Sequence, residues 1–189
     1  MSSPASTPAL KAPLRLGLAG LGTVGIGVVK IVQEHAALIE ARTGRPVVIT
    51  AVSARDRTKN RDADLSGYAW EVDPVALARR EDVDVFIEVM GGHEGAARDA
   101  TEAAIAHGKD VVTANKALLA HHGQALSLAA EAAGRVIRFE AAVAGGIPVI
   151  KALTEGLAGN RMKRVMGVMN GTCNYILTRM QSANLSYET

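Results

Sequence analysis

A glycine-rich turn near the start of the chain, Gly20-Leu21-Gly22-Thr23-Val24-Gly25, constrains the fold more than any other segment. It follows an apolar run at 14–20, which is typical of a buried strand, and precedes a stretch at 23–41 whose apolar residues recur at helical spacing. A G-x-G-x-x-G sequence between a strand and a helix is characteristic of dinucleotide-binding βαβ units. The alternative is a glycine-rich turn that holds no ligand.

Each glycine of this turn has a separate role if a dinucleotide binds there. Gly20 permits the tight turn, Gly22 lets a pyrophosphate approach the backbone, and Gly25 lets the helix pack closely on the strand. Thr23 and Val24 begin the helix, whose N-terminus offers free N–H groups and a partial positive charge. The turn therefore predicts a dinucleotide cofactor.

Strands and helices alternate along the first part of the chain. The expected strands lie at 14–20, 47–54, 83–89, 110–115 and 135–143, and the expected helices at 23–41, from 74 onward, at 94–107 and at 126–133. Aromatic residues make up only 3% of the chain, so the core must consist of small and branched aliphatic side chains. The pattern predicts an α/β fold of the Rossmann type, a doubly wound parallel sheet with right-handed crossovers.

The regular alternation of strands and helices ends near residue 140, which divides the chain into parts. Residues 1–13 are rich in Ser, Pro and Ala and are expected to form a disordered tail, and 14–139 the dinucleotide-binding domain. The remainder, 140–189, predicts the beginning of an α+β substrate and dimerisation domain, with a helix near Pro148, a strand near 162–169 and the opening of another helix. That strand finds few partners in the chain, so we expect the second domain to be truncated or completed by another chain.

Charge and composition exclude several classes of protein. The formal net charge is +2 and no run of five like charges occurs, so no nucleic-acid partner is expected. No segment approaches 18 uninterrupted apolar residues, so no membrane span is expected. The single cysteine allows no intrachain disulfide and the N-terminus lacks the pattern of a secretory signal, which favours a cytoplasmic location.

The end of the second predicted strand indicates which dinucleotide would bind. A carboxylate at this point usually accepts the ribose 2′-hydroxyl of NAD, but the chain reads Val52-Ser53-Ala54-Arg55 here. Arg55, with Arg57 and Lys59 nearby, matches the 2′-phosphate of NADP instead. The sequence favours NADP, NAD stays possible, and the cations could also be ordinary loop residues.

Two further features follow predicted strands at the edge where cofactors bind in doubly wound sheets. Gly91 and Gly92 come after the strand at 83–89, and glycines there allow close backbone approach to a ligand. Lys116 comes directly after the strand at 110–115. The first feature could be a simple turn, and the second a solvated surface charge.

Four motifs together are similar to those of the homoserine dehydrogenase family. They are the glycine-rich turn, VVTANKALLA at 111–120, AAVAGGIPVIKAL at 141–153 and VMNGTCNYILTRM at 168–180. The resemblance covers about 14–187 and implies reversible NAD(P)-dependent interconversion of L-homoserine and L-aspartate 4-semialdehyde, a step in threonine, methionine and isoleucine biosynthesis. It also implies a homodimer through the second domain, and an acid/base lysine and substrate-binding carboxylates beyond Thr189. We therefore expect this chain to bind cofactor and to turn over little substrate alone.

The resemblance also implies roles for particular residues. It puts Lys116 beside the nicotinamide and the substrate. It puts the turn Asn170-Gly171-Thr172 beside the amino-acid substrate, although helix capping would explain these residues equally well. It further implies a site for a monovalent cation such as sodium, whose ligands would be mainly backbone carbonyls; a glycine-rich loop between domains is the alternative. The residues of that site are Glu140, Val143, Gly145 and Ile147.

Two other functions stay open at this point. Cys173 stands at the start of a predicted helix, where a thiol has a lowered pKa, so the chain could be a phosphorylating semialdehyde dehydrogenase that works through a thioester. No histidine is an evident general base for it, and a buried inert thiol is the commoner fate of a cysteine. The chain could also be a non-catalytic NADP-sensing domain.

Overall fold

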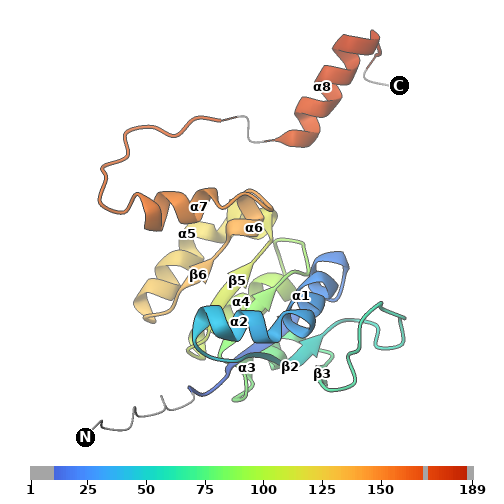
Figure 1. The fold of residues 1–189 in the computed structure, drawn as a ribbon, viewed down its shortest axis with the longest axis vertical. Helices are drawn as coiled ribbons and strands as arrows, with labels where there is room; N and C mark the ends of the chain where they lie inside the picture. The colour runs from blue at the N-terminus through green and yellow to red at the C-terminus, as the bar shows by residue number, and fades with distance from the viewer. Residues whose placement is uncertain (1–10, 168–169, 187–189) are drawn as a thin grey trace, which may run out of the picture. The chain divides into compact units, whose positions relative to one another are not determined.

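A computed structural model describes residues 11–167 and 170–186 (Figure 1). The chain forms two compact units, which divide between Gly145 and Gly146. Most of the predicted tail at 1–13 lies outside the described residues, and 11–13 have no regular secondary structure.

The first unit is built on a parallel sheet of six strands in the order β3-β2-β1-β4-β5-β6. The strands are β1 (Leu14–Ala19), β2 (Val47–Ser53), β3 (Ala69–Glu71), β4 (Val85–Glu88), β5 (Asp110–Thr113) and β6 (Ile137–Arg138). The helices are α1 (Thr23–Glu34), α2 (Ala36–Thr43), α3 (Pro74–Arg79), α4 (Ala96–Ala106), α5 (Lys116–Ala132) and α6 (Glu140–Val143). The predicted α/β class with a doubly wound parallel sheet is therefore confirmed.

The strand order reverses between β1 and β4, which lie side by side at the centre of the sheet. β1 pairs with β2 on one side and with β4 on the other, where Leu16 faces Val85 and Ala19 faces Glu88. In open parallel sheets, such a reversal opens a crevice at the carboxyl ends of the strands. The glycine-rich turn leaves β1 at this point, and Gly91 and Gly92 follow β4 there.

Two hydrophobic clusters cover the two faces of the sheet. One joins the strands to α1 through Leu18, Val29 and Val52. The other joins the opposite face to α3, α4 and α5 and includes Phe86 and Leu118. The face of α4 that packs on the sheet is made mainly of small side chains, and its buried residues are Ala97, Ala100, Thr101, Ala104 and Ile105. This agrees with a core built from small and branched aliphatic side chains.

Two predicted helices have different bounds in the structure. The helix expected at 23–41 is divided at His35 into α1 and α2, and Gly44 ends α2 in the left-handed conformation with φ 72°. The helix expected at 126–133 begins ten residues earlier, at Lys116, because the Asn115 side chain accepts a hydrogen bond from the Leu118 N–H and caps it. The alanine- and leucine-rich sequence that follows continues the helix despite Gly123.

The prediction of a strand at 135–143 is wrong beyond Arg138. Only Ile137 and Arg138 pair with β5, at the edge of the sheet. From Glu140 the chain forms the short helix α6, because β5, the strand that pairs with β6, ends at Thr113, and because Glu and Ala favour a helix. The short strand β3, which pairs in parallel with β2, was not predicted.

The second unit contains helices in its described residues. α7 (Val149–Lys151) begins after Pro148 and continues into a π-helical turn at Ala152–Gly156, and α8 covers Gly171–Ala183. The strand expected at 162–169 is absent across 162–167, and the last two of its residues lie outside the described residues. The physical reason is that a strand needs a partner for its backbone N–H and C=O groups, and the described part of this unit offers none.

Candidate functional site

The glycine-rich turn has the geometry that its sequence predicts. Gly20 has φ 103°, and a Cβ atom there would lie 2.7 Å from the carbonyl oxygen of Val89. A Cβ atom at Gly25 would overlap the carbonyl oxygen of Gly20. The Gly20 N–H donates to the carbonyl of Ser53, so the turn is also tied to the end of β2. Only glycine fits at Gly20 and Gly25 without moving the backbone.

The N-terminus of α1 is left open toward solvent. Gly22 is its N-cap residue and has no side chain to accept a hydrogen bond, whereas Asn115 caps α5 and Asp73 caps α3. The first turn of α1 carries no acidic residue, Thr23 is exposed, and a Cβ atom at Gly22 would meet nothing within 4 Å. Free N–H groups, the positive helix end and open space together suit a phosphate group.

A cavity of about 410 Å³ lies at the carboxyl edge of the sheet. Its lining residues come from the start of α1, the loop after β4 and the start of α5: Val24, Val89, Met90, Gly91, Ala114, Asn115, Lys116 and Ala117. The cavity thus brings together three residues that the sequence singled out, Val24, Gly91 and Lys116. Gly92 is the next residue of the β4 loop, and both glycines have positive φ, at 83° and 82°.

Lys116 is the first residue of α5, and its side chain is exposed. A lysine is electrostatically unfavourable there, because the helix N-terminus already carries a partial positive charge. Across the described ranges, no hydrogen bond or ion pair compensates the ammonium group. An anionic ligand in the cavity would supply that compensation.

A buried hydrogen-bond network behind the cavity was not predicted. The Glu88 carboxylate, which is fully buried, accepts from the N–H groups of Met90 and Gly91 through Oε1, at 2.8 and 3.4 Å. Its Oε2 accepts from the Thr113 hydroxyl at 2.7 Å. The sequence contained a signal for this network, because Glu88 is an acidic residue at the end of an otherwise apolar strand, directly before the Gly-Gly break.

Histidine rings lie next to the same loop. The rings of His93 and His121 stack with centroids 4.1 Å apart, and His122 Nε2 lies 2.7 Å from the Glu94 carboxylate. The hydrogen bond from His122 and, to a lesser extent, the Arg98 guanidinium hold the pKa of Glu94 below its usual value. In the part of the chain that the structure describes, no group of three or more His, Cys, Asp or Glu side chains could hold a metal ion.

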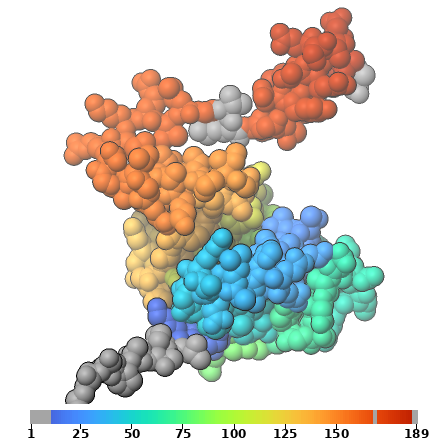
Figure 2. Space-filling view, in the orientation of Figure 1, coloured from blue at the N-terminus to red at the C-terminus, as the bar shows by residue number. Residues whose placement is uncertain are grey.

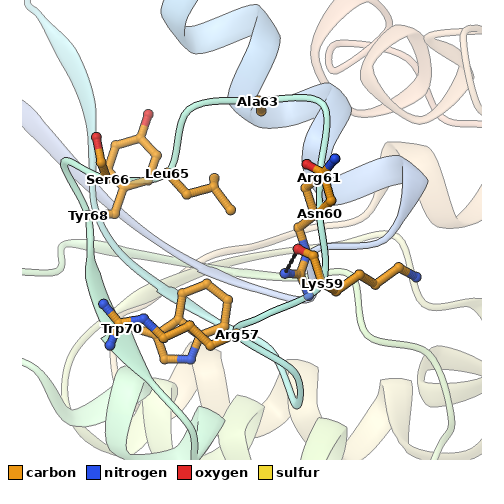
Figure 3. Close-up of a pocket in the computed structure, with 9 residues that line it drawn as sticks. All are labelled: Arg57, Lys59, Asn60, Arg61, Ala63, Leu65, Ser66, Tyr68 and Trp70. Atoms are coloured by element: carbon orange, nitrogen blue, oxygen red, sulfur yellow. Dashed lines mark hydrogen bonds between the residues drawn. The ribbon is translucent and has the colours of Figure 1, made fainter.

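Arg55 is exposed just beyond the end of β2, where the sequence placed it, but it does not line the cavity that contains Lys116. The basic residues that follow it line a pocket of about 300 Å³ (Figure 3). The guanidinium groups of Arg57 and Arg61 lie over the ring of Trp70, at 5.7 and 5.6 Å from its centroid. Lys59 also lines this pocket.

Arg61 connects this pocket to the glycine-rich turn. Its Nε donates to the carbonyl of Leu21 at 3.2 Å, and its two Nη atoms donate to the carbonyls of Lys59 and Asp56. The same β2–β3 segment lies against α1 in the space-filling view (Figure 2). Lys30 Nζ of α1 and Asp62 of this segment form an ion pair of 2.6 Å. The segment is therefore anchored to the glycine-rich turn and to α1.

The other predicted site residues belong to separate places in the chain. Asn170 caps α8, since its side chain accepts from the Cys173 N–H at 3.0 Å, and Gly171 and Thr172 form the exposed first turn. The thiol of Cys173 is free and exposed. Three of the four residues predicted to bind a cation lie in the first unit: Glu140, Val143 and Gly145. The fourth, Ile147, lies in the second unit. The substrate and cation assignments stay predictions.

The strand order, the glycine-rich turn and the cavity at the reversal of the sheet define a dinucleotide-binding domain of the Rossmann type. Two family profiles match the chain: "Homoserine dehydrogenase, NAD binding domain" over residues 20–140 and "Homoserine dehydrogenase" over 148–189. The chain belongs to the homoserine dehydrogenase family.

Individual relatives agree with this assignment. The chain is 45% identical over 175 residues to the homoserine dehydrogenase of Neisseria gonorrhoeae and 44% identical to that of Bacillus subtilis, in both cases over 93% of this chain. The crystal structure of a homoserine dehydrogenase from Thiobacillus denitrificans superposes with a TM-score of 0.84 at 41% identity, covering 93% of this chain and 40% of that one. The chain spans about 40% of the length of these relatives.

A hyperthermophilic archaeal homoserine dehydrogenase in complex with NADPH shares the fold, with a TM-score of 0.75 at 24% identity over 93% of this chain and 58% of that one.

Among the described residues, no helix is both long enough and apolar enough to cross a membrane.

Proposed function

We propose that the protein to which this chain belongs interconverts L-homoserine and L-aspartate 4-semialdehyde with NAD(P). This chain would supply the cofactor-binding domain and the start of the substrate domain. The observation that carries the proposal is the cavity at the reversal of the sheet, where Val24, Gly91 and Lys116 meet beside the uncapped N-terminus of α1. Family membership supports the choice of substrate.

The residues of this chain would bind and orient the reactants. The bound cofactor supplies or accepts the hydride. The N–H groups at the start of α1 would hold the pyrophosphate, and the glycines of the β4 loop would let the nicotinamide ring approach the backbone. Lys116 would hold the substrate carboxylate or the cofactor, or lower the pKa of a proton donor. The main acid/base lysine is expected beyond Thr189.

A binding and activity experiment tests this function. The 189-residue chain should bind NADPH in a calorimetric titration, and the full-length protein should reduce aspartate 4-semialdehyde with NADPH without added phosphate. Cys173→Ser should leave that reduction near normal, which eliminates the thioester route. A strict requirement for phosphate or arsenate would instead support a phosphorylating enzyme. NADP binding whose affinity does not change when substrate is added would support a sensing domain.

We further propose that NADP is preferred to NAD because Arg55 binds the 2′-phosphate. Arg55→Ala should raise the Kd of the chain for NADPH about tenfold or more, since a charge-assisted hydrogen bond contributes about 1.5–3 kcal/mol. The Kd for NADH should not change. The matched control is Arg42→Ala, which removes another exposed arginine, from the last turn of α2.

Calorimetry with each cofactor measures both constants. An unchanged affinity of Arg55→Ala for NADPH would remove Arg55 from the site. The pocket lined by Arg57 and Lys59 would then be the next candidate for the 2′-phosphate.

Three finer assignments belong to the same proposal: a homodimer through the second domain, a monovalent cation at the carbonyls of 140–147, and a cytoplasmic location. The exposed apolar side chains of the second unit support the first of these. Met166, Tyr175 and Leu177 are 79%, 66% and 63% exposed, as expected for a surface that another part of the protein covers.

A further inference from the structure

We propose that Glu88 is a positioning residue for the nicotinamide end of the cofactor. Its buried carboxylate holds the loop after β4 and the start of α5 at the separation that shapes the cavity between them. This inference rests on the proposed function, because it takes a dinucleotide as the ligand of that cavity. It assigns a role to a residue that is fully buried and does not line the cavity itself.

The first wall of the cavity is held from behind by Glu88. The carboxylate accepts from the N–H groups of Met90 and Gly91, and both residues line the cavity. Gly91 has a positive φ, so the backbone turns at the residue whose N–H group Glu88 binds. Glu88 is 0% exposed, so water cannot replace these hydrogen bonds.

The second wall is reached through Thr113. The Thr113 hydroxyl donates to Glu88 Oε2 at 2.7 Å and accepts from the Asn115 N–H at 3.0 Å. The Asn115 side chain then accepts from the Leu118 N–H, which fixes the start of α5 and therefore Lys116, and donates back to the carbonyl of Gly92. The network is a closed loop of hydrogen bonds around the rear of the cavity.

The direction of these hydrogen bonds requires a carboxylate at position 88. Both carboxylate oxygens act as acceptors, one for two backbone N–H groups and one for a hydroxyl. An amide keeps a single acceptor oxygen and brings two new donors. If its oxygen faces Met90 and Gly91, its NH₂ group faces Thr113, whose hydroxyl already accepts from Asn115 and then has no acceptor for its own proton. Glu88→Gln therefore keeps the size of the side chain, but it can reach Thr113 only by reversing that hydrogen bond, which leaves the Thr113 proton without an acceptor in a buried site and weakens the connection between the two walls.

The other end of the cofactor site does not depend on this network. The β2–β3 segment, on the side of the sheet that binds the adenosine half in Rossmann domains, is tied to the glycine-rich turn by Arg61 and to α1 by Lys30. In the part of the chain that the structure describes, no side-chain hydrogen bond of Glu88, Thr113 or Asn115 reaches that segment. A positioning role of Glu88 should therefore affect the nicotinamide half of the ligand and spare the adenosine half.

The test compares two ligands on the same chain by calorimetry. NADPH fills both halves of the site, and adenosine 2′,5′-bisphosphate fills the adenosine half only. For Glu88→Gln we expect the Kd for NADPH to rise about tenfold or more, and the Kd for the bisphosphate to stay within about twofold of the wild type. Thr113→Val removes the hydroxyl at nearly constant shape and should behave like Glu88→Gln, whereas Thr113→Ser keeps the hydroxyl and should restore NADPH binding.

Each outcome decides the proposal. Equal weakening of both ligands would show that Glu88 only maintains the fold, and unchanged NADPH binding would show that the cavity does not depend on it; both results overturn the inference while the proposed function stands. A wild-type chain that binds no NADPH would overturn both. If Glu88→Gln does not fold, the Thr113→Val and Thr113→Ser pair decides by the same criteria.

Discussion

Gly25→Ala should severely weaken NADPH binding by this chain while α1 itself is retained. The expected result follows from the backbone geometry, because a Cβ atom at Gly25 would overlap the carbonyl oxygen of Gly20 and also lie 3.4 Å from Val89 Cγ2. α1 must then move away from β1, and its N-terminal N–H groups leave the position where they meet the pyrophosphate. We expect the Kd to rise at least about a hundredfold, which corresponds to about 2.7 kcal/mol.

The control lies two residues further along the same helix. Gly27 is also a glycine of α1, but a Cβ atom there would meet nothing within 4 Å. Gly27→Ala should bind NADPH like the wild type and raise the free energy of unfolding by about 0.5–1 kcal/mol, because alanine is the better helix former. Calorimetry and thermal unfolding of both variants make the comparison. Normal NADPH binding by Gly25→Ala would refute the role of the glycine-rich turn.

The glycine-rich turn could be predicted from the sequence because its geometry depends only on residues that are neighbours in the chain. Gly20, Gly22 and Gly25 are needed by a strand, a tight turn and a helix that follow one another directly. The cavity was predicted for a related reason: parallel strands end at the same edge, so Gly91 and Lys116, which follow neighbouring strands β4 and β5, had to lie near the turn after β1.

The elements that were missed depend on contacts between distant residues. Thr113 and Glu88 are 25 residues apart, and only the pairing of β4 with β5 brings the hydroxyl to the carboxylate. β3 is three residues long, too short to produce a visible alternation. The strand expected near 162–169 had a suitable sequence, but strand formation needs a partner, and the described residues of the second unit contain none.

Lys116→Ala should lower kcat/KM of the full-length enzyme about a hundredfold with the fold intact. The reason is that Lys116 lines the cavity at the positive end of α5, where its charge has no protein partner among the described residues. Removing a group that stabilises charge in the transition state typically costs two to three orders of magnitude, or about 2.7–4 kcal/mol. Lys11→Ala is the control, because Lys11 is an exposed lysine that precedes β1 and does not line the cavity.

The ligand that Lys116 holds can be read from the constants that change. If the ammonium group binds the substrate carboxylate, Lys116→Ala raises KM for homoserine and leaves the Kd of this chain for NADPH unchanged. If it binds the cofactor, that Kd rises in the 189-residue chain, where no complete substrate domain is needed. Lys116→Arg keeps the charge and should recover part of either loss, since the guanidinium also binds anions but in a different geometry. A change in kcat/KM below about threefold, well under 1 kcal/mol, would make Lys116 a surface charge, and the unfavourable placement of a lysine at the start of α5 would then have no functional explanation.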